Sequence, residues 1–147
     1  MTVETYSDRY FLDVVKIVEN FHKEAVREYD DLFDAVSLIE TIKNADPSGA
    51  FLLIIDGTCQ GLLFGVKTKS LINGKTIFQE IIWYVNEPYR ACGAGVRLLR
   101  SAENMLKSQG VSIMIMAVLE NSKTQKLKSF YTRLGFKPME THFVRDL

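Results

Sequence analysis

The sequence predicts an α/β (α+β) fold in which a mixed central sheet of six to seven strands is flanked by about four helices. Two observations lead to this prediction. Three strand-like segments follow one another with turn signals between them, which is the pattern of an antiparallel meander. A fourth strand is then separated from the third by a helical segment, and a connection of this length joins parallel strands. We therefore expect a meander followed by one parallel β-α-β crossover.

The length and composition fit one globular domain. The chain has 147 residues, of which 47% are hydrophobic and 24% charged, and this composition is not that of a disordered protein. A chain of this length fits a single domain over residues 1–147. Its 18 Lys and Arg residues balance 18 Asp and Glu residues. The zero net charge argues against whole-molecule electrostatic binding to nucleic acid or anionic lipid.

The cysteines and the N-terminus predict a cytoplasmic protein. Cys59 and Cys92 form neither a disulfide framework nor a metal-ligand spacing, so no metal site is expected. The residues after Met1 lack the basic and apolar regions of a signal peptide. The apolar runs are shorter than the ~18 residues that a membrane-spanning helix needs. We expect a protein of the reduced cytoplasm that does not bind membranes.

The charges divide unevenly along the chain. Residues 1–50 hold 5 basic and 11 acidic side chains, a net charge of −6, and residues 51–147 hold 13 basic and 7 acidic side chains, a net charge of +6. Solvated surfaces that differ by chance would give the same counts. The alternative is that the acidic and the basic parts face different partners.

The first 50 residues predict a short strand and two helices. Val3–Ser7 is strand-like, and Ser7 or Asp8 can cap the helix that follows. Apolar residues then recur at helical spacing: Phe11, Val14, Val15, Val18 and Phe21. A second helix is predicted over Asp31–Asn44. Its inward side chains are expected to be Leu32, Val36 and Ile39.

The meander is predicted from a change of period after residue 50. Strands are expected over 50–56, 59–70 and 75–85. The turn pairs Asp56-Gly57 and Asn73-Gly74 separate them. These pairs are the strongest short hairpin signals, because both positions of such a turn need a positive φ.

The last third predicts the crossover and the end of the sheet. A helix follows the meander with four apolar residues on one face: Val96, Leu99, Ala102 and Leu106. Gly110 stands at the position of a C-terminal cap, and Ser112–Leu119 is strand-like. A last helix over Lys123–Leu134 turns inward Leu127, Phe130, Tyr131 and Leu134, with Gly135 as its cap. Two short final strands are expected, Phe136–Lys137 and Thr141–Val144.

The segment Arg90-Ala91-Cys92-Gly93-Ala94-Gly95 joins a predicted strand to a predicted helix, and we call residues 90–96 the glycine loop. Backbone N–H groups and the helix dipole make such a loop an anion site, and glycine lets the backbone approach a phosphate. It lies at the carboxyl end of a strand, where ligands bind in open α/β sheets. A tight turn without a ligand is the simpler interpretation.

Two other phosphate-binding motifs do not fit the loop. The lysine and hydroxyl residue of a P-loop are absent. A dinucleotide-binding loop needs a third glycine, where this chain has Leu98, and it follows the first strand of a parallel sheet rather than a meander. A loop that binds the pyrophosphate of coenzyme A is the third candidate.

Two segments resemble the GNAT family of N-acetyltransferases. Residues 80–95, Glu-Ile-Ile-Trp-Tyr-Val-Asn-Glu-Pro-Tyr-Arg-Ala-Cys-Gly-Ala-Gly, resemble its motif A, an apolar strand followed by Arg-x-x-Gly-x-Gly. Residues 130–136, Phe-Tyr-Thr-Arg-Leu-Gly-Phe, resemble its Tyr-x-x-Leu-Gly-Phe signature. The resemblance covers residues 50–137. The small size and the ending Glu140-Thr-His-Phe-Val144 also resemble stand-alone phage and prophage acetyltransferases.

The resemblance implies a site for acetyl-CoA between the last strand of the meander and the next parallel strand. The backbone of Trp83 and Val85 would bind the pantetheine arm, while both side chains pack. Loop amides would bind the pyrophosphate, and the residues concerned are Arg90, Ala91, Cys92, Gly93, Ala94, Gly95 and Val96.

Two side chains are candidates for the chemistry. Strand alternation places Glu80 on one face with Ile82 and Tyr84, where burial would raise its pKa towards that of a useful base. Glu80 resembles the general-base glutamate of some family members, and Tyr131 resembles the tyrosine that protonates or positions the CoA sulfur. The alternatives are a solvated Glu80, an attack assisted only by ordered water, and a Tyr131 that only packs in the core.

The sequence departs from the family at three positions. Thr124 stands seven residues before Tyr131, where many members have a cofactor-contacting Asn, and Asn121 stands ten residues before it. In the glycine loop, Ala91 and Cys92 stand where Gly or Lys is frequent. A cysteine at a helix start can have a lowered pKa, but a direct transfer needs no acyl-enzyme.

The predicted function is an acetyl-CoA-dependent N-acetyltransferase that transfers acetyl directly to a primary amine of a small molecule or peptide. The acidic run Glu28-Tyr29-Asp30-Asp31 lies where the family builds its acceptor pocket and suits a cationic acceptor; a solvated helix end is the alternative. His142 would lie on the acceptor side, whereas a lone surface histidine is its simpler interpretation. A catalytically silent CoA-binding module and a structural interaction protein without cofactor are the alternative functions. A homodimer is left open.

Overall fold

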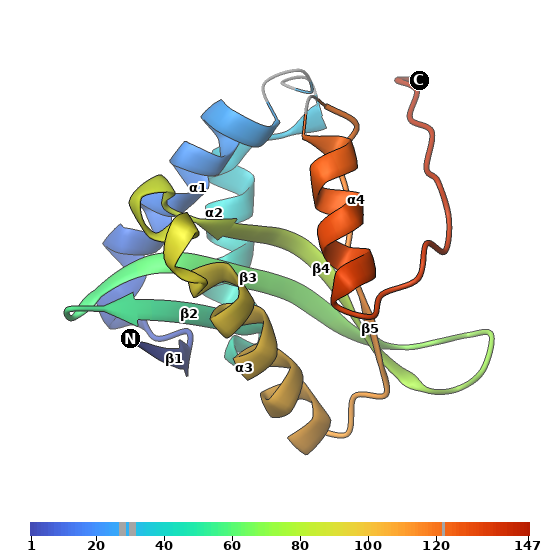
Figure 1. Cartoon of the computed structure of the whole chain (residues 1–147), viewed down its shortest axis with the longest axis horizontal. Coiled ribbons are helices and arrows are strands. Elements are labelled where there is room, and N and C mark those ends of the chain that lie inside the picture. Colours follow the sequence, from blue (N-terminus) through green and yellow to red (C-terminus); the bar gives the residue numbers. More distant parts are fainter. Residues whose placement is uncertain (27–28, 30–31, 122) are drawn as a thin grey trace. The chain divides into compact units, whose positions relative to one another are not determined.

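The computed structural model describes residues 1–26, 29, 32–121 and 123–147 (Figure 1). The chain divides into two compact units, Met1–Ala117 and Val118–Leu147. The first unit contains the whole sheet and three of the four described α-helices. The second unit contains the fourth α-helix.

The sheet of the first unit has five strands in the order β1-β2-β3-β4-β5. They are Thr2–Thr5, Ala50–Ile55, Thr58–Lys69, Thr76–Val85 and Ile113–Ile115. The first four pair antiparallel, and β5 pairs parallel with β4, Ile77 opposite Ile113 (Figure 1). The predicted mixed sheet, with its meander and its parallel crossover, is confirmed.

The turns of the meander contain glycines with positive φ values. Asp56 and Gly57 have φ values of 50° and 77°, as the Asp-Gly turn requires. Between β3 and β4 the connection is wider, because the Ser70 N–H bonds to the Lys75 carbonyl oxygen and Gly74, with a φ of 70°, lies inside this loop.

The strand count is lower than the predicted six to seven, because the two short final strands do not form in the described residues. The segments Phe136–Lys137 and Thr141–Val144 have no ladder partner there. Phe143 and Val144 are 95% and 66% exposed, so their apolar pattern does not mark a buried strand face. A short segment forms a stable strand only where another strand pairs with it.

Helix α1, Phe11–Ala25, buries the predicted Val14, Val18 and Phe21, and Ile17 in addition, whereas Phe11 and Val15 are only partly buried. Helix α2, Ala35–Asn44, buries Leu38 and Ile42 rather than the predicted Leu32 and Val36, which are 48% and 64% exposed. The prediction was wrong because the described helix begins only at Ala35. Its N-cap Asp34 accepts a hydrogen bond from the Val36 N–H, so Leu32 precedes the helix and does not share its period.

The two faces of the sheet carry different helices. One face joins α1 and α2 in a single apolar core; its strand residues are Ala50, Leu52, Ile54, Cys59, Leu62, Phe64 and Ile82. Helix α3, Ala94–Ser108, contacts β2, β3 and β4 and crosses the sheet in Figure 1. It buries the predicted Leu99, Ala102 and Leu106, and Leu98 and Ala94 as well. Gly110, with a φ of 84°, follows its C-terminus as predicted.

In the second unit, α4 spans Thr124–Arg133 and buries Tyr131. The Tyr131 ring meets the Phe136 ring edge to face, with centroids 5.4 Å apart. The Phe136 N–H donates to the Tyr131 carbonyl oxygen at 3.0 Å, and Gly135 has a φ of 92°. The inward position of Tyr131 and the glycine cap are confirmed. Across the described residues of both units, we find no helix with the length and apolar character to span a membrane.

Candidate functional site

Strands β4 and β5 separate partway along the sheet. Their pairing ends at Gln79 and Ile115, whereas β4 continues to Val85. Within the described residues, the β5-facing edge of β4 from Glu80 to Val85 therefore has no strand partner. Free strand edges bind extended ligands through backbone hydrogen bonds. The separation also explains why β5 is shorter than the predicted Ser112–Leu119.

Glu80 lies where the two strands part. Its carboxylate Oε2 accepts a hydrogen bond of 2.8 Å from the Ala117 N–H, beyond the end of β5. Burial raises the pKa of Glu80 to about 7, and the Ala117 hydrogen bond opposes this shift. A carboxyl group with such a pKa can accept or give a proton near neutral pH.

A β-bulge re-aims Glu80. Phe64 pairs with Ile82 but the next residue, Gly65, pairs with Glu80, so Ile81 is an extra residue in β4. The predicted grouping of Glu80 with Ile82 and Tyr84 on one face is therefore wrong. Ile82 belongs to the α1–α2 core. Glu80 lies on the opposite face of the sheet, which it shares with Phe78, two residues earlier in β4.

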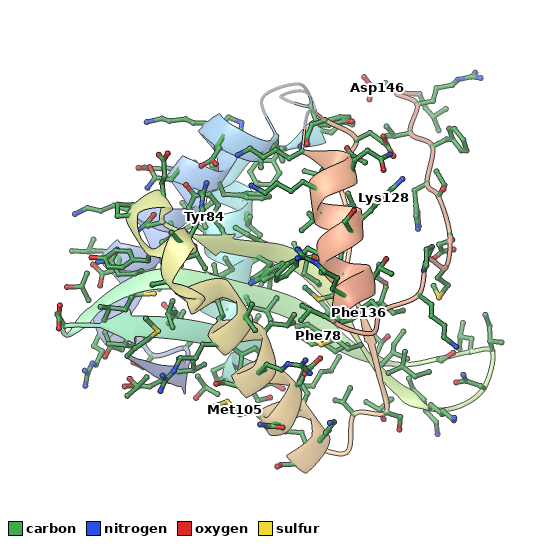
Figure 2. The ribbon with its side chains drawn as sticks, in the orientation of Figure 1. Phe78, Tyr84, Met105, Lys128, Phe136 and Asp146 are labelled. Atoms are coloured by element: carbon green, nitrogen blue, oxygen red, sulfur yellow. The ribbon has the colours of Figure 1, made fainter. Side chains whose placement is uncertain are left out.

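Gly65 is packed tightly at the bulge. A Cβ atom on it would lie 2.3 Å from the Gln79 carbonyl oxygen and 2.5 Å from Cζ of the Phe78 ring. Phe78, labelled in Figure 2, also contacts the Phe51 ring edge to face with centroids 6.1 Å apart. Only glycine lets these backbones and this ring meet, so the bulge and the position of Glu80 depend on it.

The glycine loop forms an open helix start. The 3-10 helix η4, Glu87–Cys92, ends at Gly93, whose φ of 76° turns the chain into α3. Among the described residues, no side chain caps α3, and its first turn holds no acidic residue. The first N–H groups of a helix lack intrahelical acceptors, so they are available to an anion. These features fit the pyrophosphate of coenzyme A.

Gly95 serves packing. A Cβ atom on it would lie 3.6 Å from Cζ2 of Trp83 and 3.9 Å from Cγ2 of Val85. The side chains of Trp83 and Val85 therefore face α3, and both residues belong to the part of β4 that β5 does not pair with. Ala94 is fully buried, whereas Ala91, Cys92 and Gly93 are exposed.

Arg90 is engaged by protein groups on three sides. Its Nη1 and Nη2 donate to the two Glu24 oxygens at 2.5 and 2.8 Å, and its Nε donates to the Val85 carbonyl oxygen at 2.7 Å. Its guanidinium lies 4.9 Å from the centroid of the Tyr84 ring. The Tyr84 hydroxyl donates to Glu24 at 2.7 Å. The Arg90 side chain thus ties the loop to α1 and to the end of β4.

These contacts affect two pKa values. Hydrogen bonds to Glu24 raise the pKa of Arg90 above its usual value. Burial, with the Glu24 carboxylate, raises the pKa of Tyr84 to about 12. Both groups therefore keep their protons at neutral pH.

A surface pocket of about 540 Å³ lies beside this network. Its lining residues are Asn20, Lys23, Glu24, Gln60, Tyr84, Asn86, Glu87, Pro88 and Tyr89. Tyr84 marks its place near the carboxyl end of β4 in Figure 2. Asn20 donates to Asn86 at 3.2 Å and Asn86 donates to Gln60 at 2.8 Å, so carboxamides hold one wall together.

The second unit holds Tyr131, the other predicted catalytic residue, on α4. The Thr124 hydroxyl, at the predicted position of a cofactor contact, lies within 2.9 Å of the Asn121 N–H and the Leu119 carbonyl oxygen. Asn121 Oδ1 accepts from the Lys123 N–H at 2.8 Å. Both side chains organise the start of α4.

The remaining candidates make the following contacts. The Cys92 thiol donates to the Tyr89 carbonyl oxygen at 2.9 Å. His142 is exposed and lies 3.3 Å from Glu140. Of the acidic run, Glu28, Asp30 and Asp31 lie outside the described residues. No group of three or more His, Cys, Asp or Glu side chains placed to hold a metal ion occurs in the described part of the chain.

Sequence reasoning missed Glu24 and the Ala117 N–H. Glu24 follows Asn20 by one helical turn, so the spacing predicts that both lie on one face of α1. It does not predict the partner of Glu24, Arg90, which is 66 residues away in the chain. Ala117 acts through its backbone, so its residue type carries no signal. Both contacts depend on how the chain packs, which local patterns do not report.

The fold and the site define an α/β protein whose parallel strand pair opens near a helix start without a side-chain cap among the described residues. The chain belongs to the acetyltransferase (GNAT) family, whose family model matches residues 12–136. This membership confirms the predicted family and the predicted class of enzyme, an N-acetyltransferase. No curated protein matches the sequence.

Solved structures share the fold at low sequence identity. A ribosomal-protein-alanine N-acetyltransferase from Brucella melitensis biovar Abortus 2308 aligns over 100% of both chains, with a TM-score of 0.78 and 11% identity. A Trypanosoma brucei acetyltransferase aligns over 99% of both chains, with a TM-score of 0.71 and 17% identity. AAC(6')-Iy, in complex with the bisubstrate analogue CoA-S-monomethyl-acetylneamine, aligns over 99% of this chain and 97% of its own, with a TM-score of 0.74 and 14% identity.

Proposed function

We propose that the protein transfers an acetyl group from acetyl-CoA directly to a primary amine. The observation that carries this proposal is the edge of β4 that β5 does not pair with, which runs from the Glu80 carboxyl group to the glycine loop. A donor bound along this edge would have its pyrophosphate at the start of α3 and its acyl end near a group that can accept a proton.

The donor is proposed to be held mainly by backbone groups. The β4 edge at Trp83 and Val85 would bind the pantetheine arm, and the N–H groups of residues 91–96 would bind the pyrophosphate. The open start of α3 supports this assignment, since no described side chain caps it and its first turn holds no carboxylate to repel an anion. Arg90 would contribute through its backbone, because Glu24 and Val85 engage its side chain.

Glu80 is proposed as the general base and Tyr131 as the general acid. Glu80 takes a proton from the amine, directly or through an ordered water. The amine nitrogen then bonds to the acetyl carbon in place of the CoA sulfur, and the Tyr131 hydroxyl gives that sulfur a proton. Solvent restores both side chains. The pKa of Glu80, about 7, suits a base that works near neutral pH.

The acceptor is proposed to be a primary amine on a small molecule or a peptide, and not a nucleic acid or a membrane component. The net charge of −6 in residues 1–50 suits a cationic acceptor. An aminoglycoside acetyltransferase from an uncultured soil metagenomic sample, a structure of the same fold at 14% identity, was solved in complex with sisomicin. Aminoglycosides therefore belong among the amines to be tested, and a cytoplasmic location remains part of the proposal.

The test is release of free CoA from acetyl-CoA with a panel of polyamines, aminoglycosides and short peptides. We expect one class of amine to give turnover. Glu80→Gln and Tyr131→Phe should each lower kcat by about 10²-fold or more while CoA affinity stays within about threefold. Glu19→Gln, an exposed change on α1, is the matched control and should retain full activity.

Three outcomes would contradict the proposal. Full activity in both variants would remove Glu80 and Tyr131 from the mechanism. Binding of acetyl-CoA without turnover by any amine would indicate a silent CoA-binding module. Absence of a thermal shift with millimolar acetyl-CoA would exclude a donor site, because a ligand that binds only the folded state must stabilise it.

A further inference from the structure

We propose that Glu24 is a positioning residue for the glycine loop, and that it acts by holding the Arg90 side chain as a strut between α1, the end of β4 and the loop. This inference rests on the proposed function, because the loop it positions is the proposed pyrophosphate site. It assigns a role to a residue of α1 that lies outside both sequence motifs.

The first support is the geometry of the ion pair. Both terminal nitrogens of Arg90 meet both oxygens of Glu24, which is the bidentate arrangement that fixes a guanidinium in one plane. The side chains are only 35% and 31% exposed. A fork of this kind constrains orientation as well as distance, so it can hold a loop in register with a helix.

The second support is that the other described contacts of the Arg90 guanidinium add to the same constraint. Nε bonds to the Val85 carbonyl oxygen, at the last residue of β4. The guanidinium stacks on Tyr84, whose hydroxyl bonds to the same Glu24 carboxylate. The Arg90 side chain thus joins β4 to the glycine loop. The edge of β4 is proposed to bind pantetheine, and the N–H groups of the loop are proposed to bind pyrophosphate.

Arg90 lies close enough to the start of α3 for its ion pair with Glu24 to affect the alignment of the loop N–H groups. Three residues separate Arg90 from Ala94, the first residue of α3, and Gly93 between them has a φ of 76°. A Cβ atom on Gly93 would meet none of the described atoms within 4 Å, so no neighbouring group packs against this face of Gly93. Glycine itself does little to fix it, since its backbone is free to move. An anchor on its N-terminal side therefore decides how well the N–H groups are aligned before an anion binds.

The test is the affinity for coenzyme A of Glu24→Gln, measured by titration calorimetry. If Glu24 positions the loop, the Kd should rise about tenfold, with KM for the donor rising in proportion and kcat changing less than about twofold. If instead Arg90 is a phosphate ligand that Glu24 restrains, the same change frees it and the Kd should fall. Electrostatics alone also predicts a lower Kd, since the variant loses a negative charge.

Two further variants keep the result specific. Glu19→Gln removes the same charge from the same helix and should leave the Kd within about twofold. Arg90→Lys keeps the positive charge but cannot form the fork, so it should weaken binding as much as Glu24→Gln, and the double variant should be no weaker than either single one. Hydrogen exchange should accelerate over residues 87–97 in Glu24→Gln without ligand, while the melting temperature shows that the chain is folded.

The failure of this inference is distinct from the failure of the proposed function. A wild-type chain that does not bind coenzyme A would overturn both. A wild-type chain that binds coenzyme A, together with an unchanged or tightened Kd in Glu24→Gln, would overturn the positioning role alone.

Discussion

The Glu80 carboxylate bonds to the Ala117 N–H at 2.8 Å where β4 and β5 stop pairing. A side chain thus takes the place of the next ladder bond between two diverging strands. The bond gives the Ala117 N–H an acceptor. It also keeps a carboxyl group at the start of the part of β4 that β5 does not pair with. Structure and proposed chemistry therefore depend on the same residue.

The pH dependence of the reaction should report Glu80. The base works only when ionised, so kcat/KM should rise with pH through an apparent pKa of about 7 and then level off. In Glu80→Gln this rise should disappear from the residual rate. Rates with a chosen amine from about pH 5.5 to about pH 9 measure both profiles, after correction for ionisation of the amine. A rise that survives unchanged in the variant would assign it to another group.

The free energy of unfolding should also depend on Glu80, but the contribution of Glu80 should fall as pH rises, whereas the catalytic rate should rise. Burial raises the Glu80 pKa from 4.5 to about 7, so the folded state binds the proton more tightly than the unfolded state. The resulting stabilisation is complete below pH 4.5 and is lost as pH rises through 7. Glu80→Gln should therefore gain stability relative to wild type above pH 7 and not below pH 4.5. Urea unfolding at about pH 4.5 and about pH 8 tests this, and an equal difference at both would contradict it.

The two glycines of the loop should respond differently to alanine. Gly93 has a φ of 76°, so Gly93→Ala places a side chain in the left-handed region and should lower the melting temperature by about 2–6 °C. At Gly95 a methyl group would meet Trp83 at 3.6 Å, an ordinary contact, so Gly95→Ala should shift the melting temperature by no more than about 2 °C. Calorimetric scans compare them, and a larger loss at Gly95 would reverse the assignment.

The two cysteines should differ sharply in reactivity. Cys59 is 2% exposed, and burial raises the pKa of its thiol to about 12, whereas Cys92 is exposed in the glycine loop. Iodoacetamide at about pH 8 should alkylate Cys92 in the folded protein and Cys59 only in denaturant. Coenzyme A should slow the first reaction, which mass spectrometry of peptides resolves. Cys92→Ala is the control, and equal labelling of both folded-state thiols would contradict the described burial.

Features set by local sequence were predictable. The Asp56-Gly57 turn depends on two positive φ values, and the end of α3 depends on the conformational freedom of Gly110. The parallel pairing of β4 and β5 followed from the length of the helical connection between them. Each of these depends on neighbouring residues or on chain connectivity, which the sequence displays directly.

Features set by tertiary packing were not predictable in the same way. The extra residue Ile81 shifts Glu80 to the other face, and the bulge lies where Gly65 on the neighbouring strand closely approaches Gln79 and Phe78. The Arg90–Glu24 pair joins a motif to a helix 66 residues away. The two predicted final strands do not form in the described residues, where no neighbouring strand pairs with them. Such features require knowledge of which segments meet.

The central claim is that the β4 edge and the glycine loop bind the acyl donor, and titration of ¹⁵N-labelled protein with coenzyme A tests it most directly. The account predicts saturable shifts of the amide signals of Trp83, Val85 and residues 91–96. Shifts confined to the pocket residues Asn20, Lys23 and Gln60, or no shifts at millimolar coenzyme A, would contradict it.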